Sequence, residues 1–369
     1  MGMAMPEPCR ALRSCGLLLR MTSDDPSSAR PIVFINFWRD GGMRHYAESL
    51  VHALQPTAQV CYLRNYEGAT GAEGAVLDLD FHPLRGRNWV NVMRIARLLR
   101  ELRPRAVHLN NEQPALLPLY PLLGRMNSVI TLHDARSHAG ERLAKRAFHS
   151  LHLRLVARFI RKIIVHSAAI ADALPDFIPR ERVHIVPHVN YSLWARTVTP
   201  PPAAPPLNVL FFGRILPYKG LDVLLDAFRL LDPARFHLII AGEGEVPALP
   251  APNVEIDNRF VTDEQLPGFF QRAHIVALPY HAASQSGVAQ MAFAFGKPVV
   301  ATRVGALPDI VHHEENGLLI PPGDPPALAA ALERMADATL RARFEEVIRR
   351  DQSSSDAEIR ERLLAVYDA

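Results

Sequence analysis

The chain has 369 residues, of which 49% are hydrophobic, and carries a formal net charge of +3. This length exceeds one ordinary hydrophobic core and predicts two domains. The three cysteines, Cys9, Cys15 and Cys61, are odd in number and lack metal-ligand spacing, which argues against a disulfide framework and a zinc site.

Residues 1–30 combine basic side chains with one short apolar patch, GLLL, below the ~7 residues of a signal-peptide core. We therefore expect a disordered extension without an export signal, with Met21 as an alternative start. The longest apolar runs are far shorter than the ~20 residues of a spanning helix. The sequence thus predicts no transmembrane segment and a cytoplasmic protein.

From Pro31, short apolar runs alternate with helical patterns, which predicts a first Rossmann-like domain over residues 31–196. The run PIVFINFW is an expected strand, and Gly41 and Gly42 then open an amphipathic helix. A glycine turn between strand and helix suits a phosphate, and plain packing of the turn is the alternative interpretation. Further strands are expected in AQVCYL, AVHLN, SVITLH, KIIVHS and VHIVPH, at 58–63, 106–110, 128–133, 162–167 and 183–188.

The first part of the chain is the basic part. Residues 1–205 carry 26 Lys and Arg against 16 Asp and Glu, a net +10, and the remaining 15 and 22 give −7. Much of the positive charge lies in the stretches 85–105 and 141–162, which interleave Arg with apolar residues at helical spacing. These stretches are either solvated helix faces or a surface that attracts anionic lipid or a phosphorylated acceptor. No nucleic-acid motif accompanies them, so nucleic acid is not an expected partner.

Several polar residues follow predicted strands of this domain. His133 and Asp134 end one strand, where the carboxylate could fix the histidine tautomer, although a structural histidine is the alternative. The neighbouring residues at strand ends form a candidate acceptor-side group: Asn110, Asn111, Glu112, His138 and His188. Ser167, after His166, is of the type that caps a helix, so we assign these two residues to a cap.

A proline-rich stretch, residues 197–208, interrupts the alternation and predicts an interdomain linker. Strands and helices then resume over residues 209–369, which predicts a second Rossmann-like domain whose last helix packs back on the first domain. The expected fold is α/β with two facing parallel sheets and a cleft between them. The expected strands are NVLFFG, FHLIIAGEG, NVEIDN, HIVALP, KPVVAT and GLLIPPG.

The turn after the first of these strands carries the sharpest local signal, VLFFGRILPYKGLDVLLDAF. Arg214 and Lys219 flank a turn that closes with Gly220 and leads into a helix. This places a forked cation and a flexible point charge at the carboxyl end of a strand, where open α/β sheets bind ligands. The pair suits a diphosphate; two solvated cations on a loop are the alternative.

This turn, together with LIIAGEGE, VITLHDARSHAGE and SGVAQMAFAFGKPVVATRVGALPDIVHHEENGLLIPPGD, resembles the retaining glycosyltransferases of the group 1 family. The resemblance extends from Pro31 to the C-terminus and implies the GT-B architecture of two Rossmann-like domains. It implies that Arg214 and Lys219 clamp the donor diphosphate without a metal, as charge develops on the leaving group. It likewise implies that Gly41 and Gly42 approach the donor, and that His133 faces the sugar and acceptor.

The chain departs from this family at its motif of two glutamates separated by seven residues. Alignment of MAFAFGKPVV places Met291 at the second glutamate and Ala283 at the first, and no Asp or Glu occurs from Gln265 to Pro308. Ribose recognition should weaken unless another group replaces the lost hydrogen bonds. Without these glutamates, the segment from SQSG to AFGKPVV resembles a subset of bacterial polysaccharide-assembly transferases in this family.

A polar segment remains just before the predicted helix, and its backbone N–H groups could cradle an anion. A simple helix cap is the alternative interpretation, and Gln285 or Gln290 could contact ribose or sugar in place of carboxylate. The candidate donor-binding residues here are Ser284, Gln285, Ser286, Gly287 and Val288.

The sequence and the resemblance together predict a retaining, metal-independent glycosyltransferase that uses a nucleotide sugar and acts on a glycan or lipid-linked acceptor in cell-surface polysaccharide assembly. We expect no cofactor and no metal, and a cytoplasmic protein with peripheral contact to anionic membrane. A catalytically silent homologue that binds nucleotide or a partner protein is the alternative. A dinucleotide-dependent oxidoreductase is disfavoured because the first strand–helix turn lacks Gly-x-Gly-x-x-Gly.

Overall fold

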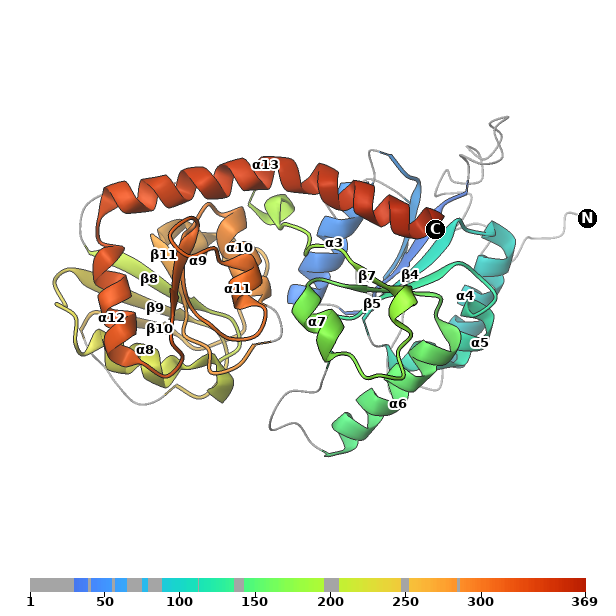
Figure 1. Ribbon diagram of the computed structural model, residues 1–369, viewed down its shortest axis with the longest axis horizontal. Coiled ribbons are helices and arrows are strands. Elements are labelled where there is room, and N and C mark those ends of the chain that lie inside the picture. The colour runs from blue at the N-terminus through green and yellow to red at the C-terminus, as the bar shows by residue number, and fades with distance from the viewer. Residues whose placement is uncertain are drawn as a thin grey trace, which may run out of the picture. The chain divides into compact units, whose positions relative to one another are not determined.

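The computed structural model describes residues 30–38, 41–54, 57–64, 75–78, 88–111, 113–135, 143–195, 206–246, 252–283 and 286–369. The chain forms two compact units, residues 1–188 with 357–369 and residues 189–356. Each unit is built on one parallel sheet with α-helices (Figure 1). The predicted disordered extension and most of the predicted linker lie outside the described residues.

The first unit contains a seven-stranded parallel sheet in the order β3-β2-β1-β4-β5-β6-β7. Every expected strand of this unit forms. The sheet contains one further strand, β3, which the sequence pattern did not predict. The strands are β1 (Ile32–Ile35), β2 (Val60–Arg64), β3 (Ala75–Asp78), β4 (Ala106–Asn110), β5 (Ser128–Thr131), β6 (Lys162–Val165) and β7 (Val183–Ile185). The helices are α3 (Gly42–Leu54), α4 (Asn88–Leu102), α5 (Tyr120–Leu123), α6 (Leu143–Phe159) and α7 (Ala168–Ala173), with short 3-10 turns η1 (Pro114–Leu119) and η2 (Arg180–Arg182).

The second unit contains a six-stranded parallel sheet in the order β10-β9-β8-β11-β12-β13. All six expected strands form: β8 (Leu207–Phe212), β9 (Phe236–Ala241), β10 (Val254–Asp257), β11 (Ile275–Leu278), β12 (Val299–Thr302) and β13 (Gly317–Ile320). The helices are α8 (Leu221–Phe228), α9 (Leu266–Arg272), α10 (Gly287–Ala294), α11 (Leu307–Ile310), α12 (Pro325–Arg334) and α13 (Ala338–Asp368), with 3-10 turns η3 (Ser192–Trp194) and η4 (Pro217–Lys219).

The strands are apolar along almost their whole length because both faces of each sheet are covered. In β1 all four residues are buried, and alternate members such as Val33 and Ile35 join the same core cluster as Val107 and Leu109 of β4. This register is fixed by pairing of Val33 with Val107 and Ile35 with Leu109. The predicted parallel, doubly wound sheets are therefore confirmed in both units.

The last turns of α13 belong to the first unit and lie beside β4 (Figure 1). The Tyr367 hydroxyl is 2.7 Å from Nδ1 of His108, a buried residue of β4, and Asn127 donates to the Tyr367 carbonyl. Arg105 also forms an ion pair with Asp368. These contacts join the C-terminal end of the chain to β4 and to the edge of the first sheet at which β4 and β5 begin.

Among the described residues, no helix combines the length and apolarity needed to cross a bilayer.

Candidate functional site

The strand order of the second sheet reverses between β8 and β11, which are neighbours. In open α/β sheets such a reversal leaves a crevice at the carboxyl ends of the strands, where ligands bind. β8 ends at Phe212, directly before Gly213 and Arg214, and β11 ends at Leu278, shortly before α10. The donor-binding residues predicted in the second unit thus follow the two strands that flank the reversal.

Lys219 ends η4 and is 7% exposed. Its Nζ lies 3.4 Å from the Phe212 carbonyl oxygen and 5.7 Å from the centroid of the Tyr280 ring. A Cβ built on Gly213 would lie 3.0 Å from this Nζ and 3.7 Å from Cγ2 of Val288. Gly213 therefore leaves room for the amine between β8 and the first turn of α10. We call Gly213, Arg214, Lys219 and Val288 the switch-point cluster.

The cluster is strongly cationic. Burial, and to a smaller extent the charge of Arg214, lowers the pKa of Lys219 from 10.5 to about 8. Arg214 itself is exposed. A buried amine beside a solvent-facing guanidinium is stabilised by an anion that neutralises both, and a diphosphate offers several acceptor oxygens to such donors. The diphosphate site expected at these two residues stays a prediction.

Ser286 was predicted either to contact the donor or to cap a helix, and the structure shows the helix cap. It is the N-cap residue of α10, and its Oγ accepts from the Ala289 N–H at 3.2 Å. Ser284 and Gln285 lie outside the described residues. Donor contacts by Ser286, Gly287 and Val288 remain a prediction.

Met291 takes the place where the resemblance puts the ribose-binding glutamate. Its side chain is 2% exposed and lies within the second unit, so it offers neither an acceptor nor an accessible atom to a ribose. Gln290, the neighbouring residue, is partly exposed.

The first sheet has its own reversal, between β1 and β4. Asn110, the last residue of β4, is fully buried, and its Nδ2 donates to Oδ1 of Asn36 and to the Met43 carbonyl, both at 3.1 Å. Gly41 has φ +69°, and its carbonyl accepts from the His45 N–H at the start of α3. A Cβ on Gly41 or Gly42 would meet nothing within 4 Å in the described structure, so this turn is open to an approaching ligand.

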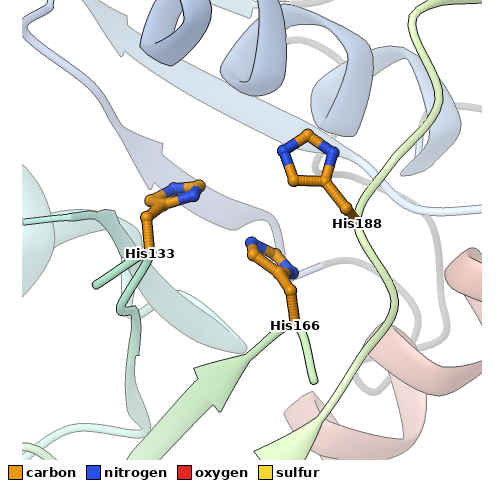
Figure 2. A group of neighbouring side chains, drawn as sticks. All are labelled: His133, His166 and His188. Atoms are coloured by element: carbon orange, nitrogen blue, oxygen red, sulfur yellow. The ribbon is translucent and has the colours of Figure 1, made fainter. Parts of the chain in front are cut away.

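Three histidines gather at the adjacent strand ends, and we call His133, His166 and His188 the histidine cluster. They follow β5, β6 and β7, which are consecutive and parallel, so their carboxyl ends share one edge of the sheet. One ring nitrogen from each lies within 4.8 Å of those of the other two. Figure 2 shows the three rings, each from a separate segment, around a common space.

Tyr46 of α3 packs against the whole histidine cluster. Its ring centroid is 4.6 Å from that of His133 and 5.1 Å from those of His166 and His188, all in edge-on contacts. Its hydroxyl is 3.5 Å from Oγ1 of Thr131 in β5. Tyr46 thereby forms one wall of the site and limits the rotation of the three imidazoles.

Hydrogen bonds set the tautomers of two of these rings. Because Nδ2 of Asn110 donates to other partners, its Oδ1 accepts from Nε2 of His133, at 3.0 Å. His166 donates from Nδ1 to the Val186 carbonyl at 3.0 Å. Burial lowers the pKa of His133 well below 6.5 and that of His166 to about 3. Both rings are therefore neutral near pH 7.

The structure brings together three of the predicted first-unit residues, namely His133, His188 and Asn110. Asn110 accepts from Nε2 of His133 and thereby sets the tautomer of this ring. The role expected of Asp134 in fixing that tautomer stays a prediction. His138 lies outside the described residues. His166 was assigned only to a cap; Ser167 does cap α7, accepting from the Ile170 N–H, while the His166 ring joins the cluster.

Solved structures define the class of fold. A sucrose-phosphate synthase from Thermosynechococcus elongatus aligns over 92% of this chain and 98% of its own, with a TM-score of 0.69 and 20% identity. HepE of Anabaena, solved with UDP and glucose, aligns over 92% and 100%, with a TM-score of 0.68 and 19% identity. Two parallel Rossmann-like sheets with these neighbours define the GT-B fold.

Sequence comparison gives matches to two family models. Residues 40–189 match the model described as Glycosyltransferase Family 4, and residues 206–338 match that described as Glycosyl transferases group 1. The two matches fall one in each half of the chain, and both models describe glycosyltransferases.

Individual relatives match over shorter stretches. D-inositol 3-phosphate glycosyltransferase of Saccharomonospora viridis is 38% identical over 145 residues, which cover 34% of each protein. D-rhamnosyltransferase WbpZ of Pseudomonas aeruginosa is 28% identical over 263 residues, covering 63% of this chain and 65% of WbpZ. The chain therefore aligns with about a third of the length of the first relative and somewhat less than two thirds of the second.

Proposed function

We propose that this protein is a retaining glycosyltransferase that moves a sugar from a nucleotide-sugar donor to a glycan or lipid-linked acceptor in cell-surface polysaccharide assembly. The observation that carries the proposal is the switch-point cluster, where a buried Lys219 and an exposed Arg214 follow β8 beside α10. The complexes of HepE with UDP and UDP-glucose and the rhamnosyltransferase name of WbpZ support the same class of donor.

In the proposed reaction, the bond between the anomeric carbon and the diphosphate breaks while the acceptor oxygen attacks from the same face. The donor's phosphate oxygen takes the acceptor proton, so no protein carboxylate is needed as a base. Arg214 and Lys219 stabilise the charge that develops on the leaving nucleoside diphosphate. This division of labour accommodates the absence of Asp and Glu between Gln265 and Pro308.

Because the two motif glutamates are absent, other residues must bind the ribose of the donor. Gln290 is the partly exposed polar residue next to the buried Met291, and we propose that its amide meets the ribose or the sugar. On the acceptor side we propose His133 as the residue that faces the transferred sugar, with Asp134, His138 and His188 around the acceptor. Asn110 positions His133 through its hydrogen bond.

A panel of nucleotides tests the proposal. UDP, GDP, ADP and dTDP, and the common sugars of each, are titrated into the full chain by calorimetry, and any donor that binds is assayed for turnover with lipid-linked acceptors. We expect one base to be selected and its sugar nucleotide to be consumed. Equal binding of nucleotide and nucleotide sugar without turnover would instead support the silent homologue, and no binding at all would refute the donor site.

The low pKa of Lys219 predicts a pH dependence of diphosphate affinity. Lys219 is charged below about pH 8 and becomes neutral above it, so the affinity for UDP should fall as pH rises from 8 to 9.5. We expect a decrease of about tenfold, because one protonation is linked to binding over this interval. The Lys219→Arg variant keeps its charge and should show a flat profile. Identical profiles for the two proteins would contradict the assignment.

The helix α4, which lies in the basic stretch 85–105, supports the proposed peripheral contact with membrane. In α4, Trp89 is 65% exposed and Met93 is 61% exposed, in a stretch that also contains Arg94, Arg97 and Arg100. Exposed aromatic and apolar side chains among arginines are typical of helices that lie in the interface of anionic bilayers. We propose that the protein acts at the inner face of the membrane through this helix.

Replacing both exposed side chains, Trp89→Glu with Met93→Glu, is expected to lower co-sedimentation with phosphatidylglycerol vesicles by at least about tenfold, since each buried side chain contributes roughly 1.5–3 kcal/mol. Leu230→Glu, at a position 61% exposed in the second unit, is the matched control and should leave binding unchanged. Unaltered binding of the double variant would assign the contact to another surface.

A further inference from the structure

We propose that the histidine cluster, His133, His166 and His188, binds a transition metal ion of the zinc class. In the part of the chain that the structure describes, these residues place one ring nitrogen each within 4.8 Å of the others, without a carboxylate or thiolate among them. Imidazole ligands favour Zn²⁺, Co²⁺, Ni²⁺ and Cu²⁺, whereas Mg²⁺ and Mn²⁺ prefer oxygen. The site is therefore distinct from any ion that would bridge a donor diphosphate.

The state of His166 is the strongest indication of a ligand. Its Nδ1 donates to the Val186 carbonyl, which leaves Nε2 as an acceptor with a lone pair. This Nε2 is fully buried and has no hydrogen-bond partner. A buried acceptor without a donor is unfavourable, because it has lost its hydrogen bonds to water. A metal ion bound at Nε2 would satisfy it, and a backbone carbonyl on the other nitrogen is the usual outer partner of a metal-binding histidine.

His133 is prepared in the same way. Its Nε2–H donates to the Oδ1 of Asn110, whose own Nδ2 is held by Asn36 and Met43, so Nδ1 keeps its lone pair. When a metal ion is bound, this lone pair belongs to the ion, and the contact of His133 with the sugar proposed above applies to the metal-free protein. The rings are also fixed from the side by Tyr46, which contacts all three. Two histidines with assigned outer partners and free lone pairs distinguish this group from a cluster of histidines that merely packs.

Binding requires a limited contraction of the cluster. Zn–N bonds of about 2.0–2.1 Å place the nitrogens of a tetrahedral site roughly 3.4 Å apart, which is closer than the 4.8 Å limit that encloses the three atoms here. His188 lies after β7, outside regular secondary structure, and is only partly buried, so its ring can shift toward the ion more readily than the two buried rings. Three protein ligands would leave the fourth position to water.

The test is metal binding by the full chain, independent of nucleotide binding or turnover. After treatment with chelator, the protein is titrated with Zn²⁺ by calorimetry and with Co²⁺ by visible absorption. We expect one equivalent to bind, with a Zn²⁺ dissociation constant below about 1 µM and the absorption of tetrahedral Co²⁺. Excess Mg²⁺ should not compete.

Two variants and one control assign the site. His166→Gln and His188→Gln should each weaken Zn²⁺ binding at least about 100-fold, as expected for loss of a direct ligand when outer partners alone account for 10–100-fold. His184→Gln, in β7 but outside the cluster, should bind as the wild type does. Thermal unfolding without metal checks that each variant is folded. If His166→Gln does not fold, His188→Gln, which changes a residue outside regular secondary structure, still tests the site. No stoichiometric binding by the wild type, or equal binding by folded variants and wild type, would overturn the proposal.

Discussion

Replacing Arg214 and Lys219 together with alanine is expected to abolish measurable transfer and to weaken binding of the nucleoside diphosphate by at least about 100-fold. Two charge-assisted hydrogen bonds contribute roughly 1.5–3 kcal/mol each to binding, and removal of one preorganised donor alone typically lowers kcat by about 10²–10³. Lys219 should contribute the larger part because it is buried beside Gly213 and does not need to be ordered when the donor binds.

The measurement is UDP affinity by calorimetry together with kcat/KM for the donor that the panel selects. Arg272→Ala is the matched control, since it removes an exposed arginine of the same unit whose partner is Glu255. The control should retain wild-type values. A double variant that kept kcat/KM within tenfold of the wild type would place the donor diphosphate elsewhere.

Gly220→Ala is expected to destabilise the protein by more than about 3 kcal/mol and to lower Tm by about 10 °C. Gly220 has φ +66°, which costs an L-residue about 1–2 kcal/mol. A Cβ at this position would also lie 2.0 Å from the Pro279 carbonyl oxygen and 3.0 Å from its carbon. Backbone atoms cannot rotate away as a side chain can, so the segment after β11 and the turn after β8 must separate.

This separation should have a functional consequence as well, because Gly220 directly follows Lys219. The His281 N–H donates to the Tyr218 carbonyl at 2.7 Å, and this bond joins the same two segments. We expect UDP binding to weaken together with Tm. Gly268→Ala, inside α9 with nothing within 4 Å of the new Cβ, should leave Tm unchanged or slightly raised. A Gly220→Ala protein with Tm within about 2 °C of wild type would refute the steric argument.

The repeated pattern of apolar runs and amphipathic stretches was sufficient to predict both sheets, since strands covered on both faces read as continuous apolar segments. β3 escaped this reasoning for a physical reason. It has four residues, one of them Asp78, and lies at the edge of its sheet beside β2 alone. Such a strand depends on its neighbour for stability and leaves little periodicity in the sequence.

The proposed donor site can be inferred from the sequence to the extent that its residues are neighbours in the chain. Gly213, Arg214, Lys219 and Gly220 occur within one turn, so their order along the chain already places the cations at a strand end. The lowered pKa of Lys219 was not predictable, because it arises mainly from burial, and the Tyr280 ring beside the amine comes from the distant segment after β11.

By itself, the sequence determined the two α/β units, the cationic turn after β8 and the absence of Asp and Glu from Gln265 to Pro308, because each depends on residues that are neighbours in the chain. Only the tertiary structure decided which histidines meet. His133, His166 and His188 stand far apart in the chain, and the parallel pairing of β5, β6 and β7 brings their ring nitrogens together. Pairing between distant strands depends on how the whole sheet buries its apolar faces, and no local pattern encodes it.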